Sequence, residues 1–282
     1  MKVALIFDAL RPDTTGTYFA RAFNRVGVAF EHFPLKQLES IPSGYDWHLR
    51  IDHGDDYEVR WPDRLRPVSF YAIDTHLAHS WKKVQRVAPW YDQVFCCHRE
   101  AAERLREAEW VPVGCDPEIH APSGGAVEWD VGFVGTDGGV PRKFYLQALR
   151  ESYPNSRIGL GDYRQMSGVY SRSRVSFNYS IRDDVNMRVF EALASGGCLV
   201  TNRLANDDYA RLGLADNEHF VLYDPGTDVF AKIDALLKDP SRREKLAKNG
   251  RAAVLAAHTY KHRLERMMEL ANSRFGWRRV PV

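Results

Sequence analysis

The sequence predicts an α/β protein of two domains, each with a parallel sheet covered by helices on both faces. Three observations predict this class. Short apolar runs of strand length alternate with amphipathic helical stretches along the chain. The 282 residues are enough for two compact halves. Near Gly114 the composition changes to prolines, glycines and the small-residue loop APSGGA at residues 121–126, which is the best candidate for a boundary.

In the first half, apolar runs and helical spacing define the expected elements. The run from Met1 to Phe7 is typical of a first strand, because it carries one lysine and reaches Asp8 without the longer apolar segment of a signal peptide. Apolar residues at helical spacing predict a helix over 16–26. We expect further strands over 30–33, 47–51, 68–73, 93–97 and 110–112, and a helix over 98–108.

In the second half the same alternation restarts after the loop. An apolar run that ends at Gly135 predicts a strand over 129–134, and the pair Gly196-Gly197 ends a helix over 188–195. Parallel sheets bind ligands at the carboxyl ends of their strands, so the loops that follow strands are the places to look for chemistry. We expect the other strands over 156–160, 175–179 and 198–201, and the other helices over 142–153, 165–171, 228–237, 242–258 and 261–275.

Composition excludes several classes of protein. Hydrophobic residues make up 44% and charged residues 27%, which suits a globular protein, and no apolar run reaches the length of a membrane span. With 39 basic and 37 acidic residues, the net charge of +2 is too balanced for a general nucleic-acid coat. The four cysteines lack the spacing of a zinc module, so we expect buried reduced thiols and a cytoplasmic protein.

The most informative segment is the loop at 183–186, rich in Asp and Asn, with the short helix behind it. Asn186 is a plausible N-cap, and the free N–H groups of the first turn, beginning at Met187, favour a phosphate. Arg188 adds a full positive charge in the same turn. Glu191 lies about one turn further in, where its carboxylate can accept hydrogen bonds from the hydroxyls of a ribose. The same spacing also fits an ordinary capped helix with Glu191 as a surface acid.

This segment also carries a family resemblance. The sequence NMRVFEALASGGCLVTN at 186–202, followed in order by LYD, DPSRREKLAKNGR and HTYKHR, resembles the C-terminal half of the CgeB-type (spore-maturation) glycosyltransferases. These belong to the wider glycosyl transferases group 1 superfamily of retaining, nucleotide-sugar-dependent enzymes with the GT-B fold. The resemblance covers about residues 129–268, half of the chain, and the first half matches only in its alternation of strands and helices.

The resemblance implies a fold and a division of roles between the halves. It implies two Rossmann-like domains with parallel sheets facing a cleft, in which residues 1–114 bind the acceptor and residues 115–261 bind the nucleotide sugar. It also implies that a last helix, about 262–282, crosses back to the first domain. In the wider group, two acidic residues lie eight positions apart around the short helix. The second matches Glu191 and grips the ribose, and the first falls on Asp183, where the wider group has glutamate.

Two further places in the second half are candidates for the donor site. After the strand at 129–134, Gly135, Thr136 and Arg142 belong to a Gly-rich turn with a basic helix start, where an arginine can neutralise a diphosphate. The turn is neither a Walker loop nor GxGxxG, and a solvated loop fits it as well, but in the resembling family this loop lines the donor site. Tyr170 is a candidate for stacking on the nucleobase, although helix packing explains it equally.

Two loops of the first half provide candidates on the acceptor side. Asp74 and His76 follow a strand, and a histidine beside a carboxylate can carry a proton or position a sugar hydroxyl. His98, after the next strand, is the rival position, and a structural role fits either histidine. Three residues after the first strand suit contacts with sugar or acceptor, or a plain helix cap: Thr14, Thr15 and Gly16.

We therefore predict a glycosyltransferase that moves a sugar from a nucleotide-diphosphate donor, with retention, to a glycan, protein, small molecule or modified nucleic acid. The alternatives are a nucleotide-sugar epimerase of the same fold and a non-catalytic sugar-nucleotide-binding protein. The resembling enzymes need no bound metal, so we predict no metal and no cofactor, and we interpret the acidic loop around His53, Asp55 and Asp56 as a solvated turn. The predicted catalytic residues are His76, Asp74, Arg188 and Asp183. The residues that leave a nucleic-acid acceptor open are Arg60, Trp61, Arg64 and Arg66.

Overall fold

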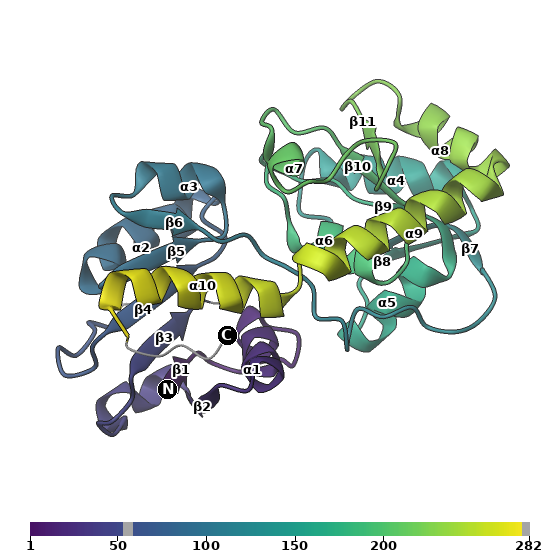
Figure 1. Cartoon of the computed structure of the whole chain (residues 1–282). Helices are drawn as coiled ribbons and strands as arrows, with labels where there is room; N and C mark the ends of the chain where they lie inside the picture. The colour runs from purple at the N-terminus through teal and green to yellow at the C-terminus, as the bar shows by residue number, and fades with distance from the viewer. Residues whose placement is uncertain (53–58, 278–282) are drawn as a thin grey trace. The chain divides into compact units, whose positions relative to one another are not determined.

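The computed structural model describes residues 1–52 and 59–277 and divides into two compact units (Figure 1). The first unit combines residues 1–113 with the chain from Tyr260 onward, and the second unit is Gly114–Thr259. The sequence had placed this boundary after residue 114 and the return of the chain at about 262. Each unit contains one sheet whose strands are all parallel, so the predicted α/β class with two parallel sheets is confirmed.

The first unit is built on a six-stranded sheet with the order β2-β1-β3-β4-β5-β6. The apolar sequences of its central strands, such as KVALI and VSFYA, are buried almost throughout, as expected for a parallel sheet covered on both faces. The strands are β1 (Lys2–Ile6), β2 (Ala29–Phe33), β3 (Trp47–Ile51), β4 (Val68–Ala72), β5 (Gln93–Cys96) and β6 (Ala108–Trp110).

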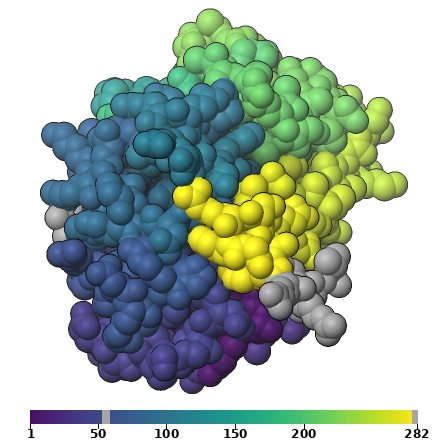
Figure 2. All heavy atoms as spheres, turned by 60° about the vertical axis from the view of Figure 1, so that its left-hand side comes forward, coloured from purple at the N-terminus to yellow at the C-terminus, as the bar shows by residue number. Residues whose placement is uncertain are grey.

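The helices of the first unit include one that arrives from the end of the chain. The ring of Tyr260 lies 5.1 Å from that of Tyr18, and Arg263 Nε donates a hydrogen bond to the carbonyl of Val113 at 3.1 Å. Figure 2 shows the yellow surface of this last helix next to blue and purple surface of the same unit. The helices are α1 (Thr15–Val26), α2 (Ala78–Val87), α3 (Arg99–Arg104) and α10 (Tyr260–Phe275), with 3₁₀ turns at Leu35–Ser40 and Ala88–Trp90.

The second unit is built on a five-stranded sheet with the order β11-β10-β9-β7-β8. Its core is formed by fully buried side chains from the strands and from the covering helices, among them Phe133, Phe177 and Leu149. The strands are β7 (Trp129–Val134), β8 (Ser156–Gly159), β9 (Ser173–Phe177), β10 (Leu199–Asn202) and β11 (Val221–Tyr223). The helices are α4 (Arg142–Ser152), α5 (Tyr163–Ser171), α6 (Met187–Ala194), α7 (Asp208–Arg211), α8 (Val229–Lys238) and α9 (Pro240–Ala257).

The order of strands creates a switch point in the second sheet. From β7 the chain passes to β8 on one side, and then crosses to β9 on the other side of β7. The loops that follow β7 and β9 therefore leave neighbouring strand ends in opposite directions. In open parallel sheets this is the place where a ligand finds room beside the strand ends.

The structure corrects some of the expected elements. The helix predicted over 98–108 is wrong in its second half: α3 ends at Arg104, Glu107 has a positive φ of 58°, and Ala108 already begins β6. Helix α2 and strand β11 were not predicted, because their apolar runs are short. All four cysteines are free and buried, as expected. Within residues 1–52 and 59–277, no helix is long and apolar enough to cross a membrane.

Candidate functional site

Arg188, in the first turn of α6, reaches back across the switch point of the second sheet. Its Nε donates to the carbonyl of Val134 at the end of β7 (3.0 Å), and its Nη1 donates to Oδ1 of Asn178 after β9 (3.0 Å). Gly135 permits this approach: it has a φ of +143°, and a Cβ there would overlap Nη2 of Arg188. The predicted residues Arg188 and Gly135 are thus brought together from distant parts of the chain.

Arg142, the first residue of α4, also lies at the switch point of the second sheet and is largely buried. Its Nε donates to the carbonyl of Asp137 at 3.0 Å, Nη2 to Thr136 Oγ1 at 3.4 Å, and Nη1 to the carbonyl of Tyr179 at 3.5 Å. Burial, and then the neighbouring charge of Arg188, lower the pKa of Arg142 to about 10. The guanidinium still carries its positive charge at neutral pH.

The two guanidinium groups form what we call the arginine pair, Arg142 and Arg188. Both lie over the ring of Phe133, with 5.9 Å and 4.5 Å from the guanidinium carbon to the ring centre. Their hydrogen bonds go only to carbonyl, amide and hydroxyl oxygens, and neither has an ion-pair partner among the described residues. Asp184 and Asp137 act on Arg142 through space without forming an ion pair with it, and the charge of Arg188 opposes them. The two like charges therefore repel one another, and a bound anion reduces that repulsion.

Asn186 stands at the N-cap position of α6 in an extended conformation, but its side chain does not cap the helix. The predicted N-cap position is therefore confirmed, without a hydrogen bond from the side chain to the helix. The amide nitrogen donates instead to Ser180 Oγ at 3.0 Å and to Asn178 Oδ1 at 3.4 Å, while its oxygen is buried without a hydrogen-bond partner. Met187 begins the helix as expected, and the positive end of the helix dipole adds to the charge of the arginine pair.

Glu191 is buried, with 7% of the residue exposed, so it is not a surface acid. Its Oε1 lies 3.6 Å from Nε2 of His120, a fully buried residue of the second unit that was not among the predicted site residues. The Nδ1 of His120 accepts a hydrogen bond from the N–H of Asp116 at 2.9 Å, so the proton of the neutral ring is on Nε2 and faces the carboxylate. No sequence motif marks His120; only the fold brings it to Glu191.

His120 gives a pH-dependent stability that can be tested. Burial lowers its pKa to about 4, below that of an unfolded histidine, so the unfolded chain binds the extra proton between these values. Stability therefore falls as pH is lowered, and this group alone should cost about 2 kcal/mol between pH 7 and pH 5. His120→Asn keeps an acceptor for Asp116 N–H and should flatten this part of the pH profile in urea unfolding. An unchanged profile would contradict the buried neutral histidine.

The other predicted residues of the second unit have structural contacts. Asp183 is exposed, with a φ of +53°; its Oδ1 accepts from the N–H of Ala205 at 2.8 Å, and its carbonyl accepts from Asn206 Nδ2 at 2.9 Å. It thus connects the loop after β9 to the loop after β10. Tyr170 is fully buried, and its hydroxyl donates to the carbonyl of Val134 at 3.3 Å, which is the packing role that the sequence had left open beside base stacking.

The second unit also has a pocket that lies away from these residues. A pocket of about 510 Å³ is lined by the loop 203–216 and Leu222, mostly by apolar side chains. It contains none of the predicted site residues. The arginine pair, by its charge and its place at the switch point, is the stronger candidate for a functional site.

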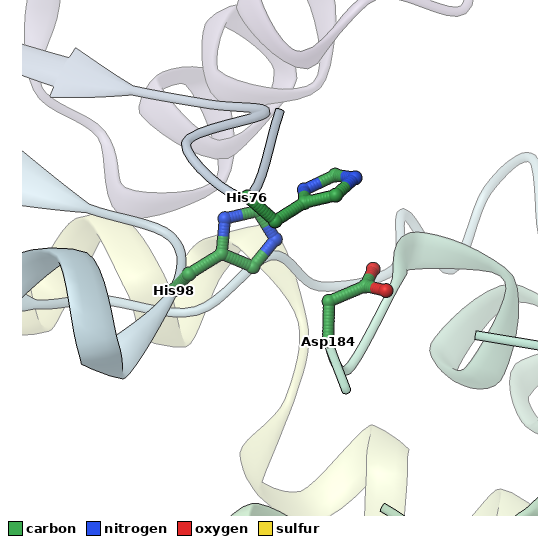
Figure 3. A group of neighbouring side chains, drawn as sticks. All are labelled: His76, His98 and Asp184. Atoms are coloured by element: carbon green, nitrogen blue, oxygen red, sulfur yellow. The ribbon is translucent and has the colours of Figure 1, made fainter. Parts of the chain in front are cut away.

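In the first unit, the two rival histidines are neighbours. The rings of His76 and His98 lie edge to face, 4.6 Å between centres (Figure 3). His98 Nδ1 is 2.8 Å from Thr75 Oγ1, whereas His76 Nδ1 is buried without a hydrogen-bond partner. Asp74, near the start of the loop between β4 and α2, has a positive φ of 52°. The ends of β4 and β5 thus place the two histidines side by side, so the two rival positions belong to one place in the structure.

The residues after β1 fit a helix cap. Thr14 Oγ1 accepts from the N–H of Thr17 at 3.4 Å, and Thr15 is buried at the start of α1. A Cβ on Gly16 would overlap the ring of Phe7, so this position needs glycine for close packing. These contacts match the plain cap that the sequence had left open as the alternative to a sugar contact.

The basic residues considered for a nucleic-acid acceptor are mostly engaged inside the first unit. Trp61 is buried and its indole donates to the carbonyl of Leu65 at 2.8 Å. Arg64 donates to three backbone carbonyls, and Arg66 pairs with Asp92. Arg60 is exposed. The candidate metal residues His53, Asp55 and Asp56 lie outside the described residues.

The chain belongs to a family of transferases. Residues 126–269, more than half of the chain and including the arginine pair, match the family model described as glycosyl transferase-like. The protein is therefore a member of the glycosyl transferase-like family, within the glycosyltransferase superfamily that the resemblance had indicated. No curated protein matches the chain.

Solved structures share the fold of the whole chain. The sucrose-phosphate synthase of Thermosynechococcus elongatus has a TM-score of 0.65 at 14% identity, covering 98% of this chain and 99% of that one. The T4 phage BGT in complex with its UDP-glucose substrate has a TM-score of 0.62 at 10% identity, covering 97% and 99%. S. aureus TarM, in complex with UDP among other ligands, has a TM-score of 0.58 at 12% identity, covering 80% and 55%. The predicted GT-B fold is confirmed.

Proposed function

We propose that this protein transfers a sugar from a nucleotide-diphosphate donor, and that the second unit binds the donor. The arginine pair is the observation that carries the proposal. Two guanidinium groups without carboxylate partners among the described residues lie at the switch point of a parallel sheet, beside the N-terminus of α6. A diphosphate can supply the direct ion-pair partner that neither arginine has among the described residues, and arginine binds phosphate oxygens in a bidentate manner.

The same pair explains how the bond to the sugar breaks. When the sugar leaves the donor, negative charge grows on the terminal phosphate, and fixed positive groups stabilise this charge without having to reorganise. Arg142 and Arg188 are held in place by backbone carbonyls at 3.0 Å, so they are preorganised for that role. We therefore propose that transfer proceeds without a bound metal. The expected result is full activity in EDTA, and loss of activity that Mg²⁺ or Mn²⁺ restores would contradict it.

Glu191 is proposed to hold the ribose of the donor. Its carboxylate lies one helical turn behind the phosphate-binding end of α6, and neutral His120 faces one of its oxygens. A carboxylate can accept hydrogen bonds from two neighbouring hydroxyls, and the ring of His120 beside it is neutral. We propose that Asp183 orients the loop before α6, because its Oδ1 and its carbonyl are both bonded to the loop after β10.

The first unit is proposed to bind the acceptor, with His76 and Asp74 as candidates for proton transfer. His76 Nδ1, buried without a partner, is available to a hydroxyl of the sugar or of the acceptor. Structural neighbours at 10–12% identity carry UDP-glucose or UDP, which makes uridine nucleotides the first donors to test. Retention, a hexose as the transferred sugar and a CgeB-type specificity remain predictions from the resemblance, and a cytoplasmic location remains a prediction from the cysteines.

A thermal-shift panel of UDP-, GDP- and TDP-sugars tests the proposal. A donor that binds only the folded protein stabilises it, and more so the tighter it binds, so one nucleotide should raise the melting temperature of the wild type and of Arg174→Ala. Arg174 is a matched control, because it is an exposed arginine of the same unit that pairs with Asp130. Arg142→Ala should reduce the shift. No shift with any sugar nucleotide would overturn the proposal.

Product analysis separates the two alternative activities. A transferase releases free nucleoside diphosphate when acceptor is added. Conversion of the donor into an isomeric sugar nucleotide without acceptor would identify an epimerase instead. Binding of the donor without release under any acceptor would identify a binding protein.

A further inference from the structure

Asn178, which follows β9 directly, is fully buried beside Arg188. Its Oδ1 accepts from Arg188 Nη1 at 3.0 Å and from Asn186 Nδ2 at 3.4 Å. Its Nδ2 donates to Thr201 Oγ1 at 3.0 Å and to Ser180 Oγ at 3.3 Å. Arginine can only donate, so the atom that faces Arg188 must be the amide oxygen, and the orientation of the amide is fixed.

The whole hydrogen-bonding capacity of Asn178 is used inside the protein. The oxygen accepts two hydrogen bonds and the nitrogen donates two. Thr201 Oγ1 is itself 3.2 Å from the hydroxyl of buried Tyr209, which extends the network towards α7. A side chain with no unused donor or acceptor does not bind a ligand directly, and acts through the residue that it holds.

We infer that Asn178 is a positioning residue, which fixes the guanidinium of Arg188 with a neutral oxygen and thereby leaves its full charge for an anionic ligand. A carboxylate at this position would hold Arg188 equally well, but it would neutralise one member of the arginine pair. An amide at position 178 therefore orients the guanidinium of Arg188 without neutralising its charge. The inference rests on the proposed function for the identity of the anion, a diphosphate group.

Asn178→Asp isolates the charge, because the change preserves shape and an acceptor for Arg188. On the other side of the side chain, Thr201 and Ser180 present hydroxyls, which can rotate from accepting to donating, so the buried network remains satisfied. We expect the Kd of inorganic pyrophosphate, measured by calorimetry, to rise about tenfold or more, since hydrogen-bonded charges are strong contributors. Asn178→Ala should also weaken binding, because Nη1 of Arg188 then loses the acceptor that holds it.

A double-mutant cycle with Arg188→Ala distinguishes positioning from a general structural effect. In the Arg188→Ala background, Asn178→Asp should change the Kd of pyrophosphate by less than about twofold. Arg174→Ala serves as the control background, in which Asn178→Asp should keep its full effect. Pyrophosphate binding by Asn178→Asp with the affinity of the wild type would overturn the inference, as would an equal loss in both backgrounds.

The melting temperature of the ligand-free protein tests the positioning role of Asn178 even if no anion binds. The carboxylate introduced by Asn178→Asp would pair with Arg188, so the effect of this change on melting should differ between the wild type and Arg188→Ala. Equal effects would overturn the positioning role. If wild type binds neither pyrophosphate nor any sugar nucleotide, the proposed function fails, while non-additive melting temperatures would still support the contact between Asn178 and Arg188.

Discussion

Arg188→Ala is expected to lower the rate of sugar transfer by about 100-fold or more, because it removes one of two fixed positive charges from the departing diphosphate. The backbone should be little affected. The side chain is only half-buried, and its loss leaves the carbonyl of Val134 and the amide of Asn178 without one donor each. Steady-state kinetics with the donor found in the thermal-shift panel measures the effect.

Two further variants are needed to interpret the result for Arg188→Ala: one that keeps the charge and one that serves as a control. Arg188→Lys keeps the charge but cannot donate in the planar geometry that joins Val134 and Asn178, so it should recover only part of the rate. Arg174→Ala, on the exposed surface of the same unit, should retain the rate of the wild type. Full transfer activity in Arg188→Ala would remove the arginine pair from the mechanism.

Gly250→Leu is expected to destabilise the second unit by about 3 kcal/mol or more, through overpacking between α9 and α6. A Cβ at this position would lie 2.5 Å from the carbonyl oxygen of His219 and 2.6 Å from a methyl carbon of Leu193 on α6. A backbone oxygen cannot move aside as a flexible side chain can. Because α6 also carries Arg188 and Glu191, donor binding should fall together with stability.

Urea unfolding, followed by hydrogen exchange of peptides from α6 and α9, measures the effect of Gly250→Leu. Lys248→Leu introduces the same side chain on an exposed position of the same helix and should change stability by less than about 0.5 kcal/mol. Equal stability of the two variants would show that α9 can move away from α6 at little cost.

The secondary structure could be read largely from the chain, because burial in a parallel sheet imposes continuous apolar runs. The strands β3 and β7 begin and end at the predicted residues, 47–51 and 129–134. The prediction is wrong over 105–108, where alanine and leucine at helical spacing suggested a longer α3. There the backbone turns at Glu107 and begins an edge strand. Pairing with β5, and not local helix propensity, determines the structure of these residues.

The candidate site was only partly visible in the sequence. Arg142, Arg188 and Glu191 stood out because charged residues followed glycines or helix starts after apolar strands. Their interpretation as one site needed the order of strands, which places the ends of β7 and β9 next to each other. Asn178 and His120 carried no signal, since a single amide or imidazole in a chain gives no indication of the group that it will face.

The sequence by itself determined the two parallel α/β sheets, the boundary region near Gly114 and the family to which the second half belongs, since these depend on periodicity and on contiguous motifs. Only the tertiary structure decided that two arginines from different helices share one aromatic ring with no ion-pair partner among the described residues, and that a buried amide holds one of them. The physical reason is that charge and hydrogen bonding act through space over a few ångströms, whatever the separation of the residues along the chain.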